Sequence, residues 1–76
     1  MSQLHWQCRR GMRELDELLL GYLDGRYATA DNTEKAAFRS LLQLSDPELI
    51  GYLLQQRTSP PELAVVIKNI LLRTGP

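Results

Sequence analysis

The chain has 76 residues and carries nine basic and nine acidic side chains, so its formal net charge is zero. A chain of this length buries only about 60% of the surface that its unfolded form exposes, and it has no room for a nucleotide-binding sheet or a barrel. The balanced charge argues against a nucleic-acid binder and against a polybasic membrane anchor. We therefore expect residues 1–76 to form a single domain that acts by binding.

The first ten residues, MSQLHWQCRR, lack the apolar stretch of a signal peptide. The longest unbroken apolar run, LAVVI at residues 63–67, is far shorter than the about 20 residues of a membrane span. Cys8 is the only cysteine, so no internal disulfide is possible, whereas small secreted domains usually carry several. We expect a reduced, cytoplasmic protein.

Two helices are predicted in the first third of the chain. Residues 2–10 form the first, which is short and has poor periodicity. Residues 12–27 form the second, because apolar side chains recur there at the spacing of one helix face, and Gly25 supplies a C-terminal stop. The inward face of this second helix consists of Leu15, Leu18, Leu19, Tyr22 and Leu23.

The third helix is predicted from the sequence DNTE. Asp31 is its N-cap and Glu34 follows three residues later, which is the capping-box spacing. The helix continues to about Leu44. Its inward side chains are Phe38, Leu41 and Leu42.

Two more helices follow, each opened by a proline. In SDPE, Asp46 is the predicted N-cap and Pro47 takes the first helical position, where a missing N–H costs nothing. This fourth helix ends near Gln56, and Ser59 is the predicted N-cap of a fifth helix that runs to about Arg73. Their apolar stripes are Leu49, Ile50, Leu53 and Leu54, and then Leu63, Val66, Ile67, Ile70 and Leu71.

The fold class that follows is all-α, a compact small bundle of about five short helices. No stretch shows sustained two-residue alternation, so no strand is predicted. Each helix alone is marginal in water, and contacts between the apolar stripes must hold the bundle together.

Side chains for metal or catalytic chemistry are few. His5 and Cys8 are three residues apart, but two ligands do not make a zinc site, and we expect no metal. Cys8 and His5 as nucleophile and base would still need an oxyanion site and a pocket. The five glycines are scattered and form no phosphate loop, so we expect no enzyme and no cofactor bound by this chain itself.

The most unusual stretch surrounds Gly11, where Arg9, Arg10 and Arg13 are followed by acidic residues. One interpretation is structural: Gly11 forms a kink between two helices, with Arg10 and Glu14 paired on one face if the helix runs through it. The other is functional: Gly11 costs the helix about 0.5–1 kcal/mol so that a partner's backbone can approach closely beside the arginines. Both remain open at this point.

The sequence HWQCRRGMRELD, residues 5–16, resembles the signature of the succinate dehydrogenase flavinylation factors, also called FAD assembly factors. That family carries an Arg-Gly-x-x-Glu motif, which Arg10, Gly11 and Glu14 match. Similar features continue through the leucines of the second helix, EKAAF, the Leu41–Leu42 pair and DPEL. The resemblance extends from residue 5 to about residue 54. One departure is Tyr52, where the family often has a tryptophan.

The resemblance implies a function. A member of this family is a five-helix assembly chaperone of the bacterial cytoplasm, and we expect a monomer. It binds the flavoprotein subunit of succinate dehydrogenase, and of fumarate reductase, and promotes covalent attachment of FAD to a histidine of that subunit.

The resemblance also implies which residues contact the partner. By position the contact residues are Arg10, Gly11 and Glu14. Neighbours expected at the rim or in support are His5, Trp6, Arg9, Met12, Arg13 and Asp16. Among these, Trp6 fits either the core or the contact surface.

Three alternatives are weighed beside this function. A flavin carrier would deliver FAD itself, but it would need a phosphate-cradling loop. An antitoxin-like helical binding module would use another face and would not depend on Arg10 or Glu14. A helix-turn-helix DNA binder could be drawn from residues 46–75, but the neutral charge argues against it.

Overall fold

Residues 3–73, which the computed structural model describes, form five α-helices and one short 3-10 helix, with no strand among them. The elements are α1 (Gln3–Gln7), α2 (Arg13–Gly25), η1 (Tyr27–Thr29), α3 (Asn32–Leu41), α4 (Asp46–Leu53) and α5 (Pro61–Arg73). The all-α prediction of about five short helices is confirmed.

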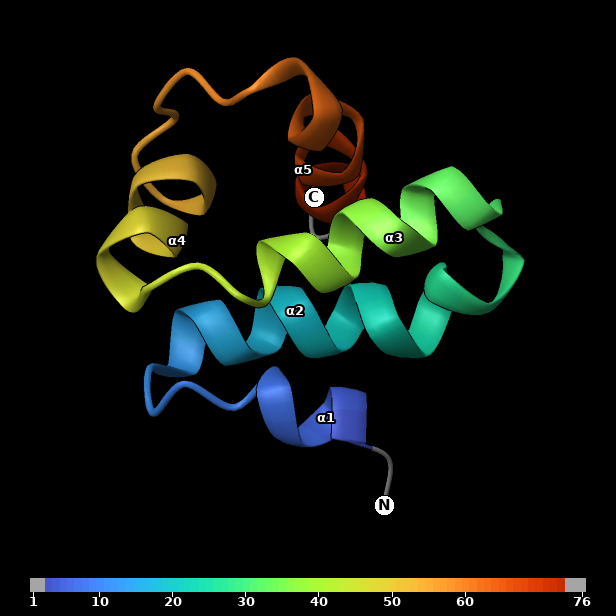
Figure 1. Cartoon of the computed structure of the whole chain (residues 1–76). Helices are drawn as coiled ribbons and strands as arrows, with labels where there is room; N and C mark the ends of the chain where they lie inside the picture. The colour runs from blue at the N-terminus through green and yellow to red at the C-terminus, as the bar shows by residue number, and fades with distance from the viewer. Residues whose placement is uncertain (1–2, 74–76) are drawn as a thin grey trace.

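The helices are arranged around α2. In Figure 1, α2 lies between α1 and α3, and α5 is seen nearly end-on above α3, with α4 beside it. The helix α5 packs against both α2 and α3, while α4 contacts α2 and α5. Within residues 3–73 no helix combines the length and the apolar character needed to cross a bilayer.

One cluster of buried side chains holds these helices together, and it comes from every α-helix except α1. The buried apolar residues are Cys8, Leu15, Leu19, Tyr22, Leu23, Phe38, Leu41, Leu42, Leu49, Leu53, Leu63, Val66, Ile67 and Ile70. The predicted stripes are therefore the core, apart from Leu54 at 36% exposure and the half-buried Leu18, Ile50 and Leu71. Burying each Leu or Ile stabilises the fold by about 1.5–3 kcal/mol, as an upper value.

Helix ends differ from the predicted bounds where two residues compete to cap. Ser45, and not Asp46, caps α4, because its hydroxyl accepts the Glu48 amide at 3.4 Å and donates to the Glu48 carboxylate at 3.1 Å. The helix α5 begins at Pro61, one residue later than a Ser59 cap would place it. The helices α1, α3 and α4 are also shorter than predicted, and η1 follows α2 where its last turn was expected.

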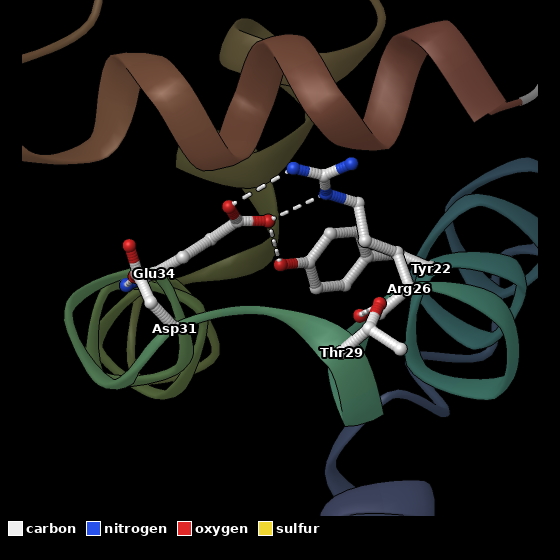
Figure 2. A network of polar contacts seen from close by, with 5 residues as sticks. All are labelled: Tyr22, Arg26, Thr29, Asp31 and Glu34. Carbon is white, nitrogen blue, oxygen red and sulfur yellow. Dashed lines mark hydrogen bonds and ion pairs between the residues drawn. The ribbon is translucent and has the colours of Figure 1, made fainter.

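Asp31 caps α3 as predicted, but only half of the capping box forms. The Asp31 carboxylate accepts the Glu34 amide at 2.8 Å. The Glu34 side chain does not return to the cap. It extends instead between α2 and α3 into a polar cluster with Tyr22 and Arg26 (Figure 2).

The Tyr22–Arg26–Glu34 cluster places the one buried charged side chain of the described residues inside the fold. Glu34 is 9% exposed, accepts a hydrogen bond from the Tyr22 hydroxyl, and lies 3.0 Å from Arg26 Nε. The Arg26 hydrogen bond lowers the pKa of Glu34, and those from Tyr22 and Asn69 lower it further, against the effect of burial. Burial, together with the hydrogen bond to Glu34, raises the pKa of Tyr22. The cluster thereby joins α2, α3 and α5.

The depressed pKa of Glu34 predicts how stability depends on pH. A carboxyl whose folded pKa is lowered contributes stability above its ordinary pKa of 4.5, and this contribution is lost as the pH falls through the folded value. We expect Glu34→Gln to lower the free energy of unfolding at neutral pH by about 1–2 kcal/mol. Urea unfolding followed by circular dichroism should show a shallower acid-side loss of stability in this variant than in the parent.

Glu62→Gln is the matched control, because Glu62 lies exposed in the first turn of α5. This variant should lose only the helix-dipole contribution, about 0.3–1 kcal/mol, and should keep nearly the parent's acid-side loss of stability. If Glu34→Gln keeps the parent's acid-side slope, the cluster does not carry the pH dependence.

Candidate functional site

The residues that the sequence singled out meet at the turn between α1 and α2. We call residues 8–12 the α1–α2 corner. Cys8 closes α1 and is fully buried, and its burial raises the pKa of the thiol to about 11. This thiol is therefore a small core side chain and not a nucleophile.

Gly11 lies in this corner and not in a helix. Its φ is +81°, in the left-handed region that side chains other than glycine rarely adopt. The interpretation that Gly11 costs helix stability is wrong, because no helix runs through it and the turn itself requires glycine. A Cβ built on Gly11 would meet no atom within 4 Å, so the backbone there is open to the outside.

Arg10, next to Gly11, turns its side chain inward. The guanidinium donates to the carbonyl of Leu42, the C-cap residue of α3, and its Nη1 lies 3.5 Å from the Asp46 carboxylate in the first turn of α4. The side chain is only 17% exposed. A cation on the free carbonyls of a helix C-terminus is electrostatically favourable. Arg10 therefore joins the corner to the α3–α4 junction.

The start of α2 is stabilised from the same corner. Met12 occupies the N-cap position but gives no side-chain hydrogen bond. Asp16, in the first turn, accepts the Arg10 backbone N–H at 2.7 Å, and its negative charge lies at the favourable end of the helix dipole. Arg10 is therefore held through both its backbone and its side chain.

The predicted pairing of Arg10 with Glu14 is absent, because the two residues do not share one helix. The i, i+4 pair that forms is Arg13 with Glu17, at 3.1 Å and largely in solvent. Glu14 is exposed and has no hydrogen-bond or ion-pair partner within residues 3–73. Its carboxylate is available to another molecule.

The nine candidate residues therefore divide into two groups. Those with exposed side chains or backbone are Trp6, Arg9, Gly11, Arg13 and Glu14. Those that are half-buried are His5, Arg10, Met12 and Asp16. Trp6 is 69% exposed, so of its two interpretations the surface one holds. An exposed tryptophan and exposed arginines are the residue types that dominate binding energy at protein interfaces.

His5 serves to attach α1. Its Nε2 lies 2.8 Å from Asp24 near the end of α2, so the five-residue α1 is tied back against that helix. The sequence did not predict that Asp24 would contact His5, or that Leu42 and Asp46 would contact Arg10. Nothing local signals them, because 19 to 36 residues separate the partners. Across residues 3–73 no three His, Cys, Asp or Glu side chains gather in a way that could hold a metal ion.

Known proteins resemble the chain over most of its length. The family described as "Flavinator of succinate dehydrogenase" matches residues 2–73. A "FAD assembly factor SdhE" of Shewanella oneidensis is 35% identical over 77 aligned positions, which cover 100% of this chain and 94% of the relative. The same-named protein of Yersinia pestis is 37% identical over 73 positions, which cover 95% and 83%.

A shorter and stronger match is found in Pectobacterium atrosepticum. Its "FAD assembly factor SdhE" is 45% identical over 53 residues, which are 70% of this chain and 60% of the relative. No solved structure matches the chain. All three relatives are named as assembly factors and not as enzymes. Because the family match covers nearly the whole sequence, the chain belongs to the flavinators of succinate dehydrogenase.

Proposed function

We propose that this chain binds the flavoprotein subunit of succinate dehydrogenase through the α1–α2 corner and thereby promotes covalent attachment of FAD to that subunit. The observation that carries the proposal is the exposed backbone of Gly11, which no other atom of the described residues covers. The neighbouring Arg10 fixes this backbone in place through its contacts with the end of α3 and the start of α4. Family membership supports succinate dehydrogenase as the source of the partner, here called the client. The geometry of the corner supports the location of the contact surface on this chain.

The corner suits binding because it is ordered before a partner arrives. Arg10 makes its contacts within the fold, so docking does not have to immobilise that side chain, which would otherwise cost about 0.5–1.5 kcal/mol. Exposed Arg9 and Glu14 lie on either side of Gly11 in the chain and can form charge-assisted hydrogen bonds with the partner. Trp6 and Arg13 extend the exposed surface.

The mechanism in this proposal is a shift of the client's conformational population. The chain binds one arrangement of the client's domains better than the others and so favours it. Raising an arrangement from about 10% to about 90% of the population needs about an 80-fold preference in affinity. A few buried contacts at a protein interface reach that value. FAD stays in the client, and this chain contributes no catalytic group.

Three finer points belong to the same proposal. The flavoprotein of fumarate reductase is a second client, the chain works as a monomer, and its compartment is the cytoplasm. A flavin carrier remains the competing function, and titration of the purified chain with free FAD separates the two. The proposal expects no saturable change in flavin fluorescence at micromolar concentrations.

Loss of the gene should leave the client without covalent flavin. Succinate dehydrogenase flavoprotein from cells that lack this chain should show weak in-gel flavin fluorescence after denaturation, and the parent gene should restore it. The client's abundance, measured by immunoblot, is the control. Normal covalent flavin in the deleted cells would contradict the proposal.

Substitutions at Gly11 separate the need of the turn from the need of the partner. Gly11→Ala should destabilise the fold by about 1 kcal/mol, because alanine disfavours a positive φ. Gly11→Asn should cost less, because asparagine tolerates the left-handed region. Both should weaken binding of the flavoprotein strongly in pull-down and calorimetry if the partner contacts the bare backbone.

A larger substitution such as Gly11→Arg would add backbone strain and side-chain bulk together, so a loss of binding could not be assigned to either. Comparison of Gly11→Asn with Gly11→Ala avoids this problem. The decisive variant is Gly11→Asn. If it melts near the parent and binds the flavoprotein as the parent does, Gly11 serves only the turn.

Arg10 should behave as a structural residue. Arg10→Met removes the guanidinium from the Leu42 carbonyl and from Asp46, and we expect the free energy of unfolding to fall by about 1.5–3 kcal/mol. Asp46→Asn is the milder control, below about 1 kcal/mol, because that carboxylate is partly in solvent. Urea unfolding measures both. An Arg10→Met chain that keeps full stability but loses the flavoprotein would instead make Arg10 a direct contact.

A further inference from the structure

A groove runs between α4 and α5, beyond the end of α4 that lies away from the α1–α2 corner. It is an open, shallow hollow of about 380 Å³, and its lining includes the apolar side chains of Ile67, Leu71 and Leu72. Leu72 is 66% exposed at the edge of this hollow. Contiguous apolar surface rimmed by polar residues is a feature of protein interaction sites.

Arg57 is held at the edge of this groove by three features of the chain. Gln56 has a positive φ of 54°, which turns the backbone sharply after α4. The Arg57 N–H then donates to the Gly51 carbonyl at 2.9 Å. The Arg57 side chain lies over Gly51, where a Cβ would come within 2.9 Å of its Cδ, and its guanidinium stands 5.8 Å from the centre of the Tyr52 ring.

The charge of the groove is of one sign. Arg57 and Lys68 both line it, and none of its lining residues is acidic. Neither cation has an ion-pair partner within residues 3–73, although the chain as a whole is neutral. A guanidinium placed in position without an internal carboxylate is complementary to an external one.

The groove and the corner are close enough to serve one partner. Asp46, at the first turn of α4, contacts Arg10 of the corner, and Tyr52 near the end of α4 lines the groove. The eight residues of α4 span about 12 Å. A standard protein interface covers about 800 Å² on each partner, roughly 30 Å across, which exceeds the length of this helix.

We propose that the α4–α5 groove is a second contact site for the flavoprotein subunit, and that it takes an apolar side chain flanked by carboxylates. This inference rests on the proposed function. It adds a second place on this chain, separate from residues 8–12, at which the same flavoprotein binds. The apolar side chain packs beside Leu72, and the carboxylates pair with Arg57 and Lys68.

Photo-crosslinking tests the position of this contact. Leu72 and Val65 lie on the same helix with similar exposure, 66% and 61%. Val65 lines a different hollow that contains Asp31, Glu34 and Glu62, so it is the matched control of opposite charge. With p-benzoyl-phenylalanine at each position in turn, the full chain should crosslink to the flavoprotein from position 72 and not from position 65.

Mass spectrometry of the crosslinked client peptide tests its chemistry. The peptide should carry an apolar side chain beside at least one Asp or Glu. A crosslink to a segment without carboxylates would overturn the inference. So would a complex that forms without any crosslink from position 72, or with equal crosslinking from position 65.

Charge reversal tests the energetics. Arg57→Glu with Lys68→Glu should weaken flavoprotein binding about tenfold and make it less sensitive to salt. Lys35→Glu with Arg39→Glu on α3 changes the net charge equally and lines no part of the groove, so it should bind nearly as the parent does. Equal weakening in both double variants would overturn the inference.

Calorimetry with the parent chain separates the two proposals. If the parent binds the flavoprotein and the groove variants bind equally well, the groove inference alone fails. If the parent does not bind it, the proposed function and this inference fail together. Circular dichroism of each variant confirms that the chain is folded.

Discussion

The contact of the Arg10 guanidinium with the Leu42 carbonyl organises the functional end of the molecule. It brings the turn between α1 and α2 onto the end of α3 and the beginning of α4, which are distant in sequence. The helix α1 has five residues and no fully buried side chain, and its Leu4 packs only partly against the core, so packing by α1 holds this turn weakly. Without the Arg10 side chain, the loop that contains Gly11 would be held mainly by two contacts. These are the burial of Cys8 and the hydrogen bond from the backbone N–H of residue 10 to the Asp16 carboxylate.

Polar clusters take over part of the role that a larger core would have. A chain of 76 residues buries a smaller share of its surface than a larger domain does, and its net stability is about 5 kcal/mol. Glu34 joins α3 to α2 through Tyr22 and Arg26, and Arg10 joins the α1–α2 corner to the α3–α4 junction. Each cluster is nearly satisfied internally, although Arg10 Nε is buried without a hydrogen-bond partner in the described residues. Satisfied polar groups of this kind fix relative positions that apolar packing leaves adjustable.

Helical periodicity made the fold class and the core predictable, because a stripe of leucines expresses a local rule. The ends were less predictable. Ser45 and Asp46 are both good caps, and only the backbone conformation decides between them. The site was predicted by residue type but not by geometry. The inward turn of Arg10 is made by contacts 32 and 36 residues away, which no local pattern expresses. The positive φ of Gly11 is seen only once the turn between α1 and α2 is known. The groove was not predicted for the same reason. Arg57 comes to lie over Gly51 only because the chain turns at Gln56, and the sequence does not show that turn.

The neutral net charge conceals a local separation of charge that explains how such a small protein can be selective. Most acidic side chains near the core are matched, as Glu34 is by Arg26 and Asp16 is by the Arg10 amide. Among the charges without an ion-pair partner in residues 3–73 are Arg9 and Glu14 near the corner and Arg57 and Lys68 beside the groove; others, such as Lys35 and Glu62, lie elsewhere. A neutral surface gains little from long-range attraction to nucleic acid or membranes, so nonspecific binding is weak. In the complex that we propose, affinity depends on a partner that satisfies both places at once, because a partner matching only one leaves a charge unpaired at the other. Selectivity in the proposed complex therefore follows from the position of a few charges and not from their sum.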